Sequence, residues 1–210
     1  MAPPTSRKSR TSPEESRRLL IDATMVVLSR EGFGGTSART VAAEAGSTNG
    51  LIFYHFGSMD GLLAATASEL SDRRMSRVRE ALGGDNAATL WPYRLADAIR
   101  DEAAGDEGRA VVELLVGSRT SPGLAKPIAD AIDRSIAFAS NELQTILGDN
   151  PIVQLVPADL LAELATAAFF GLELFTQGGR EVDIERLART AALGFAQLAS
   201  LGTLPQVGPE

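Results

Sequence analysis

The sequence predicts an all-α protein of about nine helices. Residues that favour helix starts recur along the chain, and apolar residues follow them with helical spacing. No segment has the strict apolar and polar alternation that is typical of a half-buried strand. Of the 210 residues, 44% are hydrophobic, which is enough to bury a substantial core.

The first helix is predicted to start at Pro13. Ser12 is a suitable N-cap, proline is favoured at the first helical position, and Glu14 and Glu15 place carboxylates at the positive helix end. Residues 1–12 contain three basic residues and no acid, and we expect a flexible basic arm there.

An apolar stripe identifies the body of this helix. Leu20, Ala23 and Val27 lie at positions i, i+3 and i+7, so they share one face. Gly32 is expected to end the helix, with Phe33 packing back against it.

Two short helices and a longer one are expected next. The second covers 37–45, capped by Thr36 or Ser37, and the third covers 48–55. Gly46 between them can adopt the left-handed conformation that a tight helical turn needs. Ser58 then caps a fourth helix that continues to about residue 81.

The remaining sequence also has helical spacing. Pro92 and Pro122 fit first helical positions, the second behind a capping Ser121. Breaks are expected at 148–151 and 178–179, which contain glycine, proline, Asp and Asn. The expected helices are 92–103, 108–119, 122–147, 157–177 and 184–200.

The composition excludes cysteine-based sites, and the hydrophobic runs are too short for a membrane span. There is no cysteine and only one histidine, so disulfides, thiolate metal sites and cysteine nucleophiles are excluded, and we expect no metal and no cofactor. The longest uncharged apolar run, between Glu163 and Glu173, is far shorter than the roughly 20 residues of a membrane span. With no secretory signal visible, we expect a cytoplasmic protein.

Charge is distributed unevenly along the chain. The net charge is −7, but residues 1–80 carry 11 basic and 9 acidic side chains, and residues 81–210 carry 9 and 18. This asymmetry suggests a neutral-to-basic module on an acidic body, and ordinary scatter of surface charge explains the counts equally well.

The stretch TNGLIFYHF, residues 48–56, combines a polar start with an aromatic end. In a helix-turn-helix, the first residues of the second helix contact base edges in the major groove. Thr48 and Asn49 would lie there, and Asn can pair bidentately with adenine. Gly50 removes a side chain where the DNA backbone comes close.

The rest of this stretch divides into a buried face and a polar end. Ile52 and Phe56 are four residues apart and would face the protein interior. Tyr54 and His55 can donate hydrogen bonds to phosphate oxygens.

The run GFGGTSARTVAAEAGSTNGLIFYHFGSMDGLL, residues 32–63, resembles the DNA-binding signature of the tetracycline-repressor (TetR) family. The resemblance implies an all-helical homodimer with an N-terminal DNA-binding module and a C-terminal domain that binds a small ligand and dimerises. The implied domains are the arm at 1–12, a DNA-binding domain at 13–57, an effector and dimerisation domain at 58–203, and a flexible tail at 204–210.

The resemblance also implies roles for individual residues. Thr36 would contact phosphate, Thr48, Asn49 and Leu51 would contact bases or sugars, and Tyr54 and His55 would contact the backbone. The full set of expected DNA contacts is Thr36, Ser37, Arg39, Ser47, Thr48, Asn49, Gly50, Leu51, Phe53, Tyr54 and His55.

Alternatives remain for three of these residues, and three positions depart from the family pattern. His55 could be a structural histidine, Tyr54 a core residue, and Arg39 an exposed arginine with no role. Ser47 replaces the usual valine, Phe53 stands where many members have tyrosine, and Met59 stands where lysine is usual. The last two changes each remove a potential phosphate contact.

Two further sets of residues are candidates in the acidic C-terminal part. The first could line an apolar effector pocket or could be plain core: Trp91, Val112, Leu115, Phe138 and Phe169. The second mixes small and large residues on the last two helices and could form a twofold interface or pack only within the subunit: Leu160, Leu164, Ala168, Gly171, Leu172, Phe175, Leu187, Ala191, Gly194, Phe195 and Leu198.

The leading hypothesis is therefore a ligand-responsive repressor that binds a palindromic DNA operator as a homodimer and is released by a small apolar or amphipathic effector. An effector-independent DNA-binding protein acting through a protein partner, or an architectural factor, is the alternative, and a closed, filled C-terminal core would favour it. An enzyme is disfavoured because the sequence offers no catalytic dyad and no phosphate-binding glycine loop.

Overall fold

The protein is described from a computed structural model that covers residues 12–83, 93, 94, 96–98, 100, 105–148 and 156–201. Trp91, most of the basic arm, much of the helix expected over 92–103 and the tail at 204–210 lie outside these residues. The side chains of Ala191, Phe195 and Leu198 lie outside them too.

Every regular element in the described ranges is an α-helix, so the predicted all-α fold is confirmed. Expected and observed boundaries agree to within about two residues, except where the first helix continues past Gly32. The helices are α1 (Pro13–Gly35), α2 (Ala38–Glu44), α3 (Asn49–Phe56), α4 (Met59–Leu82), α6 (Asp106–Ser118), α7 (Pro122–Leu147), α9 (Ala158–Gln177) and α10 (Ile184–Leu201).

Local sequence explains the start of α1 and the kink near its end. The Ser12 hydroxyl accepts a hydrogen bond from the Glu15 backbone N–H at 3.1 Å, and the Glu15 carboxylate accepts one from the Ser12 N–H. This capping box satisfies two backbone donors that the first turn leaves open. Gly32, where the helix was expected to end, has a φ of +73°, outside helical geometry, so the expected end is a kink after which α1 continues to Gly35.

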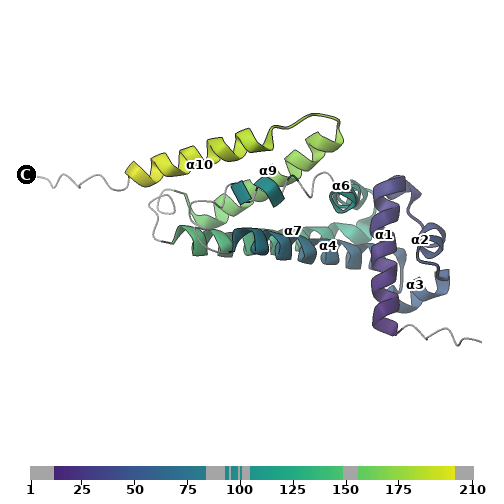
Figure 1. Cartoon of the computed structure of the whole chain (residues 1–210). Helices are drawn as coiled ribbons and strands as arrows, with labels where there is room; N and C mark the ends of the chain where they lie inside the picture. The colour runs from purple at the N-terminus through teal and green to yellow at the C-terminus, as the bar shows by residue number, and fades with distance from the viewer. Residues whose placement is uncertain are drawn as a thin grey trace, which may run out of the picture.

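Helices α1, α2 and α3, here called the N-terminal module, gather at one end of the long helices α4 and α7 (Figure 1). We call α4, α6, α7 and α9 the C-terminal bundle. α6 packs against α1, and α7 packs against both α4 and α9.

One continuous buried core joins the two parts. It includes Leu28 of α1, Val41 of α2, Ile52 of α3, Leu62 of α4 and Leu114 of α6, all essentially inaccessible to solvent. The geometry of α3 is therefore fixed by contacts that extend into the bundle.

Helix α10 packs differently. Within the described residues, a separate small cluster of Ile184, Ala188, Ala96 and Val182 holds its first turns. In Figure 1, α10 extends beside α9, at the side of the molecule away from α1.

Candidate DNA-binding surface and effector cavity

Helices α2 and α3 are joined by the tight turn that the sequence predicts. Gly46 has a φ of +59°, in the left-handed region that favours glycine. The Ser47 N–H donates to the Ala42 carbonyl at 2.8 Å, which closes the end of α2. With Val41 and Ile52 buried beneath the turn, the opposite face of α3 is turned outward.

That outward face carries most of the residues expected to contact DNA. Tyr54 is 77% exposed and Phe53 50%, although both are aromatic. Thr48, Asn49 and Gly50 are exposed at the helix start. The structure brings these groups together on one accessible surface, and Tyr54 is not a core residue.

The first turn of α3 has free hydrogen-bonding capacity. Thr48 occupies the N-cap position, but its hydroxyl makes no capping hydrogen bond. Backbone N–H groups at an uncapped helix start favour an anion, and the helix dipole adds to that preference. A DNA phosphate is one such anion.

Thr36 and Ser37 have local structural roles. The Thr36 hydroxyl donates to the Gly32 carbonyl at 2.8 Å, and Ser37 forms a capping box with Thr40 at the start of α2. Ser37 is exposed and Thr36 half-buried, so each also lies at the surface.

Ser47, Arg39 and His55 lie in different surroundings. The Ser47 hydroxyl oxygen is buried and has no hydrogen-bond partner among the described residues, whereas Arg39 is exposed. His55 is half-buried, with edge-to-face ring contacts to Tyr54 at 5.0 Å and Phe56 at 6.1 Å. These contacts give His55 a packing role whether or not it reaches phosphate.

The start of α4 lies against the end of α3, next to this surface. The Ser58 hydroxyl accepts from the Gly61 N–H at 3.0 Å, confirming the predicted cap. A Cβ on Gly61 would lie 2.2 Å from the Phe56 carbonyl oxygen, so only glycine allows α3 and α4 to approach this closely. Met59 is partly buried and packs against the main core.

Sequence reasoning missed the contact that fixes the N-terminal module on α6. The Phe33 N–H donates to the Glu113 carboxylate at 2.7 Å. The Phe33 ring lies so close to Gly117 that a Cβ there would be 2.1 Å from it. The periodicity of each helix contains no signal for this pairing, because the partners are about 80 residues apart.

Arg73 of α4 provides a second connection. It pairs with Asp22 of α1, Glu69 of α4 and Glu107 of α6. Burial alone would lower the pKa of Arg73, but the hydrogen bonds to these carboxylates raise it above its ordinary value. Arg73 therefore keeps its positive charge where three helices meet, surrounded by three carboxylates.

A cavity of about 210 Å³ lies between α4, α7 and α9. Its lining is mostly apolar and includes Phe138 and Phe169, two of the expected pocket residues. Leu115 lines a smaller neighbouring cavity, and Val112 is buried in α6 without lining either of them. The fifth expected pocket residue, Trp91, lies outside the described residues.

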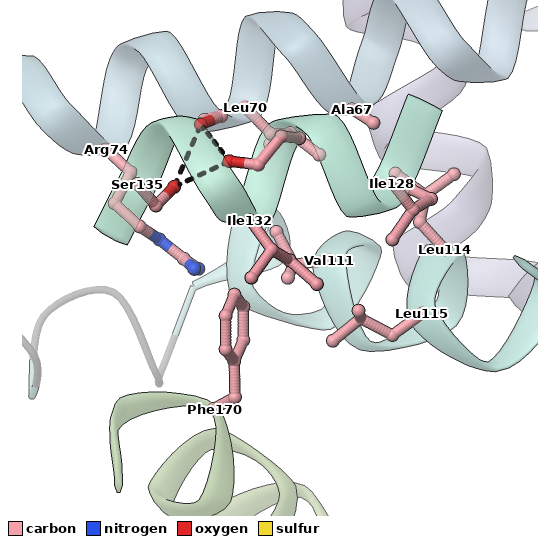
Figure 2. A pocket seen from close by; sticks show the side chains of 12 residues that line it. Ala67, Leu70, Arg74, Val111, Leu114, Leu115, Ile128, Ile132, Ser135 and Phe170 are labelled. Carbon is pink, nitrogen blue, oxygen red and sulfur yellow. Dashed lines mark hydrogen bonds between the residues drawn. The ribbon is translucent and has the colours of Figure 1, made fainter. Parts of the chain in front are cut away.

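The smaller cavity, of about 40 Å³, shares Arg74, Ser135 and Phe170 with the larger one (Figure 2). Figure 2 shows the Phe170 ring pointing from α9 toward the Arg74 side chain on α4, and the guanidinium lies 5.3 Å from the ring centroid. The Arg74 guanidinium donates to Glu173 of α9 at 2.7 Å, and Glu173 is fully buried. A buried ion pair thus stands where the two cavities meet.

Apolar side chains are exposed along α9 and α10. Leu164 is 58% exposed and Phe175 is 48% exposed, although helices of globular proteins usually bury such residues. Among the residues expected at a dimer interface, Ala168 and Gly194 are exposed and Gly171 and Leu172 half-buried. The exposed large apolar residues of these helices are Leu160, Leu164, Leu174, Phe175, Leu187 and Leu193.

Two other kinds of feature were sought within the described ranges. No helix there is long and apolar enough to cross a membrane. No group of three or more His, Asp or Glu side chains there is arranged to hold a metal ion.

Known proteins resemble both the sequence and the fold. Residues 20–66 match the family described as "Bacterial regulatory proteins, tetR family". The HTH-type nicotine-responsive transcriptional repressor HdnoR of Paenarthrobacter nicotinovorans is 25% identical over 151 residues, which cover 67% of this chain and 78% of HdnoR.

Two crystal structures have the same fold. One, assigned as a TetR-family transcriptional regulator from Rhodococcus sp., has a TM-score of 0.72 at 24% identity and covers 89% of this chain and 98% of its own. Another, assigned as a transcriptional regulator from Saccharomonospora viridis in complex with choline, has a TM-score of 0.65 at 22% identity, with coverages of 88% and 96%. Residues 20–66 therefore match the DNA-binding region of the tetR family of bacterial regulatory proteins, and the similar proteins named here are transcriptional regulators.

Proposed function

We propose that this regulator is a ligand-responsive repressor. Two copies bind a palindromic operator through α3, and a small apolar or amphipathic effector in the larger cavity releases them. The observation that carries the ligand response is the unfilled apolar cavity of about 210 Å³ between α4, α7 and α9.

The residues of α3 support sequence-specific DNA binding. Asn49 is exposed at the start of the helix, where side chains reach base edges in a helix-turn-helix. Tyr54 is exposed at its far end, where its hydroxyl can donate to a phosphate oxygen.

The exposed apolar residues on α9 and α10 support a twofold dimer. Leu164 and Phe175 would be buried between two copies, which removes their apolar surface from water. Two copies related by a twofold axis place two α3 helices on the same side of a DNA duplex, and each reads one half-site.

Effector release requires a physical connection between cavity and α3. Arg74 lines the cavity, and its neighbour Arg73 pairs with Asp22 of α1 and Glu107 of α6. A ligand that shifts α4 therefore acts on residues that orient the N-terminal module. Coupling of this kind typically changes affinity by about 5- to 150-fold.

The choline complex of the Saccharomonospora viridis protein supports a small-molecule effector, because that protein has this fold and holds a small organic ligand. An effector-independent DNA-binding protein would have a filled core, and the open cavity argues against it.

Footprinting on the DNA upstream of the regulator's own gene tests the proposal. The expected result is one protected palindrome with half-sites about one helical turn apart, bound by a dimer in light-scattering measurements. Binding of equal strength to every sequence, or binding by a monomer to a single half-site, would contradict it.

A further inference from the structure

Arg79 of α4 sits in a small cation site beside the larger cavity. Its guanidinium centre lies 4.8 Å from the centroid of the Phe138 ring, and its Nε donates to the Glu142 carboxylate at 3.3 Å. Phe138 and Glu142 both belong to α7 and both line the cavity. An aromatic face and a carboxylate together form a favourable site for an organic cation.

The exposure of the two ionic partners differs. The Arg79 side chain is 63% exposed, whereas the Glu142 side chain is only 23% exposed. Because the Arg79 side chain is largely exposed, water can solvate its guanidinium when it leaves the pair, so the cost of separation falls mainly on Glu142. Glu142, however, remains mostly covered and favours a replacement cation.

The charges around the cavity also favour a cation. Arg74 and Glu142 are the charged residues in its lining, and Arg74 is hydrogen-bonded to the buried Glu173. These three groups have a net charge of −1, which Arg79 balances. Moving Arg79 away would therefore leave a site that attracts a cation and repels an anion.

The cavity limits the size of the apolar part. An engineered apolar cavity of about 150 Å³ in another protein accepts benzene, so a space of about 210 Å³ has room for one substituted ring. The ring would be surrounded by Phe138, Phe169 and Phe170.

We infer that the larger cavity binds an amphipathic organic cation, with its apolar part inside and its cationic group in place of Arg79 between Phe138 and Glu142. This inference rests on the proposed ligand response and specifies the chemical class of its effector.

Three related small molecules test the class. (3-Hydroxyphenyl)trimethylammonium is the cation, 3-tert-butylphenol is its neutral isostere, and 3-hydroxyphenylacetate is an anion of similar size. Calorimetric titration into the full-length, DNA-free protein should give at least about 10-fold tighter binding of the cation than of either other compound, because only the cation interacts with both the carboxylate and the ring.

Two variants locate the cation. Glu142→Gln should weaken binding of the ammonium compound by about 10-fold and leave the phenol unchanged, because only the cation uses the carboxylate charge. Arg79→Gln should strengthen ammonium binding several-fold, because it removes the internal cation that competes for the site. Arg189→Gln, which removes another exposed ion-paired arginine on α10, is the matched control and should change neither affinity.

The inference is overturned if the phenol or the phenylacetate binds as tightly as the ammonium compound, if Glu142→Gln affects all three alike, or if neither the natural protein nor Arg79→Gln binds the ammonium compound. Operator release is measured separately. Cation binding with the expected variant pattern but without DNA release would contradict the ligand response and uphold the cation site. If the phenol or the phenylacetate binds more tightly than the cation and releases DNA, that result would contradict the cation site and uphold the ligand response.

Discussion

The N-terminal module and the C-terminal bundle differ in how completely side chains fill their interiors. Ile52 and Leu62 beneath α3 are fully buried in a continuous core. Around the larger cavity, Phe138, Leu143 and Phe170 are only partly buried and enclose about 210 Å³ of unfilled space. The difference agrees with the proposed function, in which the DNA-binding helix needs a fixed geometry and the effector site needs volume.

The helix starts differ in the same way. α1, α2 and α4 each begin with a side-chain cap, whereas α6, α7 and α9 have none. Local sequence therefore defines the starts of α1, α2 and α4, which form or adjoin the N-terminal module, and tertiary packing defines the starts of α6, α7 and α9. α3 is the exception in its module, since its uncapped start is the end expected to meet DNA.

Truncating one apolar side chain in each region gives the largest expected difference. Ile52→Ala should lower the free energy of unfolding by about 2 to 5 kcal/mol, because the lost contacts leave a new void in a filled core. Leu143→Ala, at the wall of an existing cavity, should cost less, about 1 kcal/mol. Urea denaturation followed by circular dichroism measures both, and equal losses would mean that the two regions are packed alike.

Adding one methyl group tests the contact between the module and α6. Gly117→Ala would place a Cβ 2.1 Å from the Phe33 ring and should cost about 1 to 3 kcal/mol of stability through overpacking. Gly34→Ala is the control, since its Cβ would meet nothing within 4 Å, and it should be neutral or slightly stabilising. If both variants melt at the natural temperature, the close contact between Phe33 and Gly117 is absent in solution.

Asn49→Ala tests base reading by the uncapped start of α3. Operator binding should weaken by about 1 to 3 kcal/mol, with relaxed preference at one position of each half-site. The melting temperature should not change, because Asn49 is exposed. Arg39→Ala is the comparison. If Arg39 contacts phosphate, its loss should reduce binding to all sequences and lower the salt slope by about one.

The binding measurement uses operator and random duplexes at several salt concentrations. An equal loss for Asn49→Ala on both duplexes would identify Asn49 as a backbone contact. An unchanged salt slope for Arg39→Ala would leave Arg39 without a role at the DNA.

Met59→Lys should change stability little. The partly buried lysine stem can keep the packing of Met59 while its ammonium group extends toward the phosphates beside α3. Binding to operator and random DNA should tighten alike, and the slope of log K against log salt should steepen by about one per subunit. Tighter binding with an unchanged slope would place residue 59 away from phosphate, and loss of folding would identify Met59 as an essential core residue.

The sequence predicted what neighbouring residues determine. The caps at Ser12 and Ser58 and the breaks at Gly32 and Gly46 are confirmed, because each depends on interactions within a few residues. The exposure of Tyr54 follows from the burial of Ile52 on the opposite face of α3.

Interactions between distant residues could not be predicted in the same way. The start of α7 after Ser121 is confirmed, but the Ser121 hydroxyl donates to Asp60 of α4 at 3.0 Å instead of capping its own helix. Glu173 is the acidic residue that ends an apolar run, and it is fully buried against Arg74, 99 residues away. Neither partner is apparent without the packing of the bundle.

The continuous core under α3 affects how this regulator could be recombined with relatives. A fragment ending at residue 57 would separate Leu28 and Val41 from Leu62 and Leu114, exposing apolar surface that the whole chain covers. A chimera that transplants only α1–α3 onto another effector domain inherits the same defect. Grafts that also carry α4 and α6, with Glu113 and Gly117, keep both sides of this contact and are the appropriate units for exchanging operator specificity.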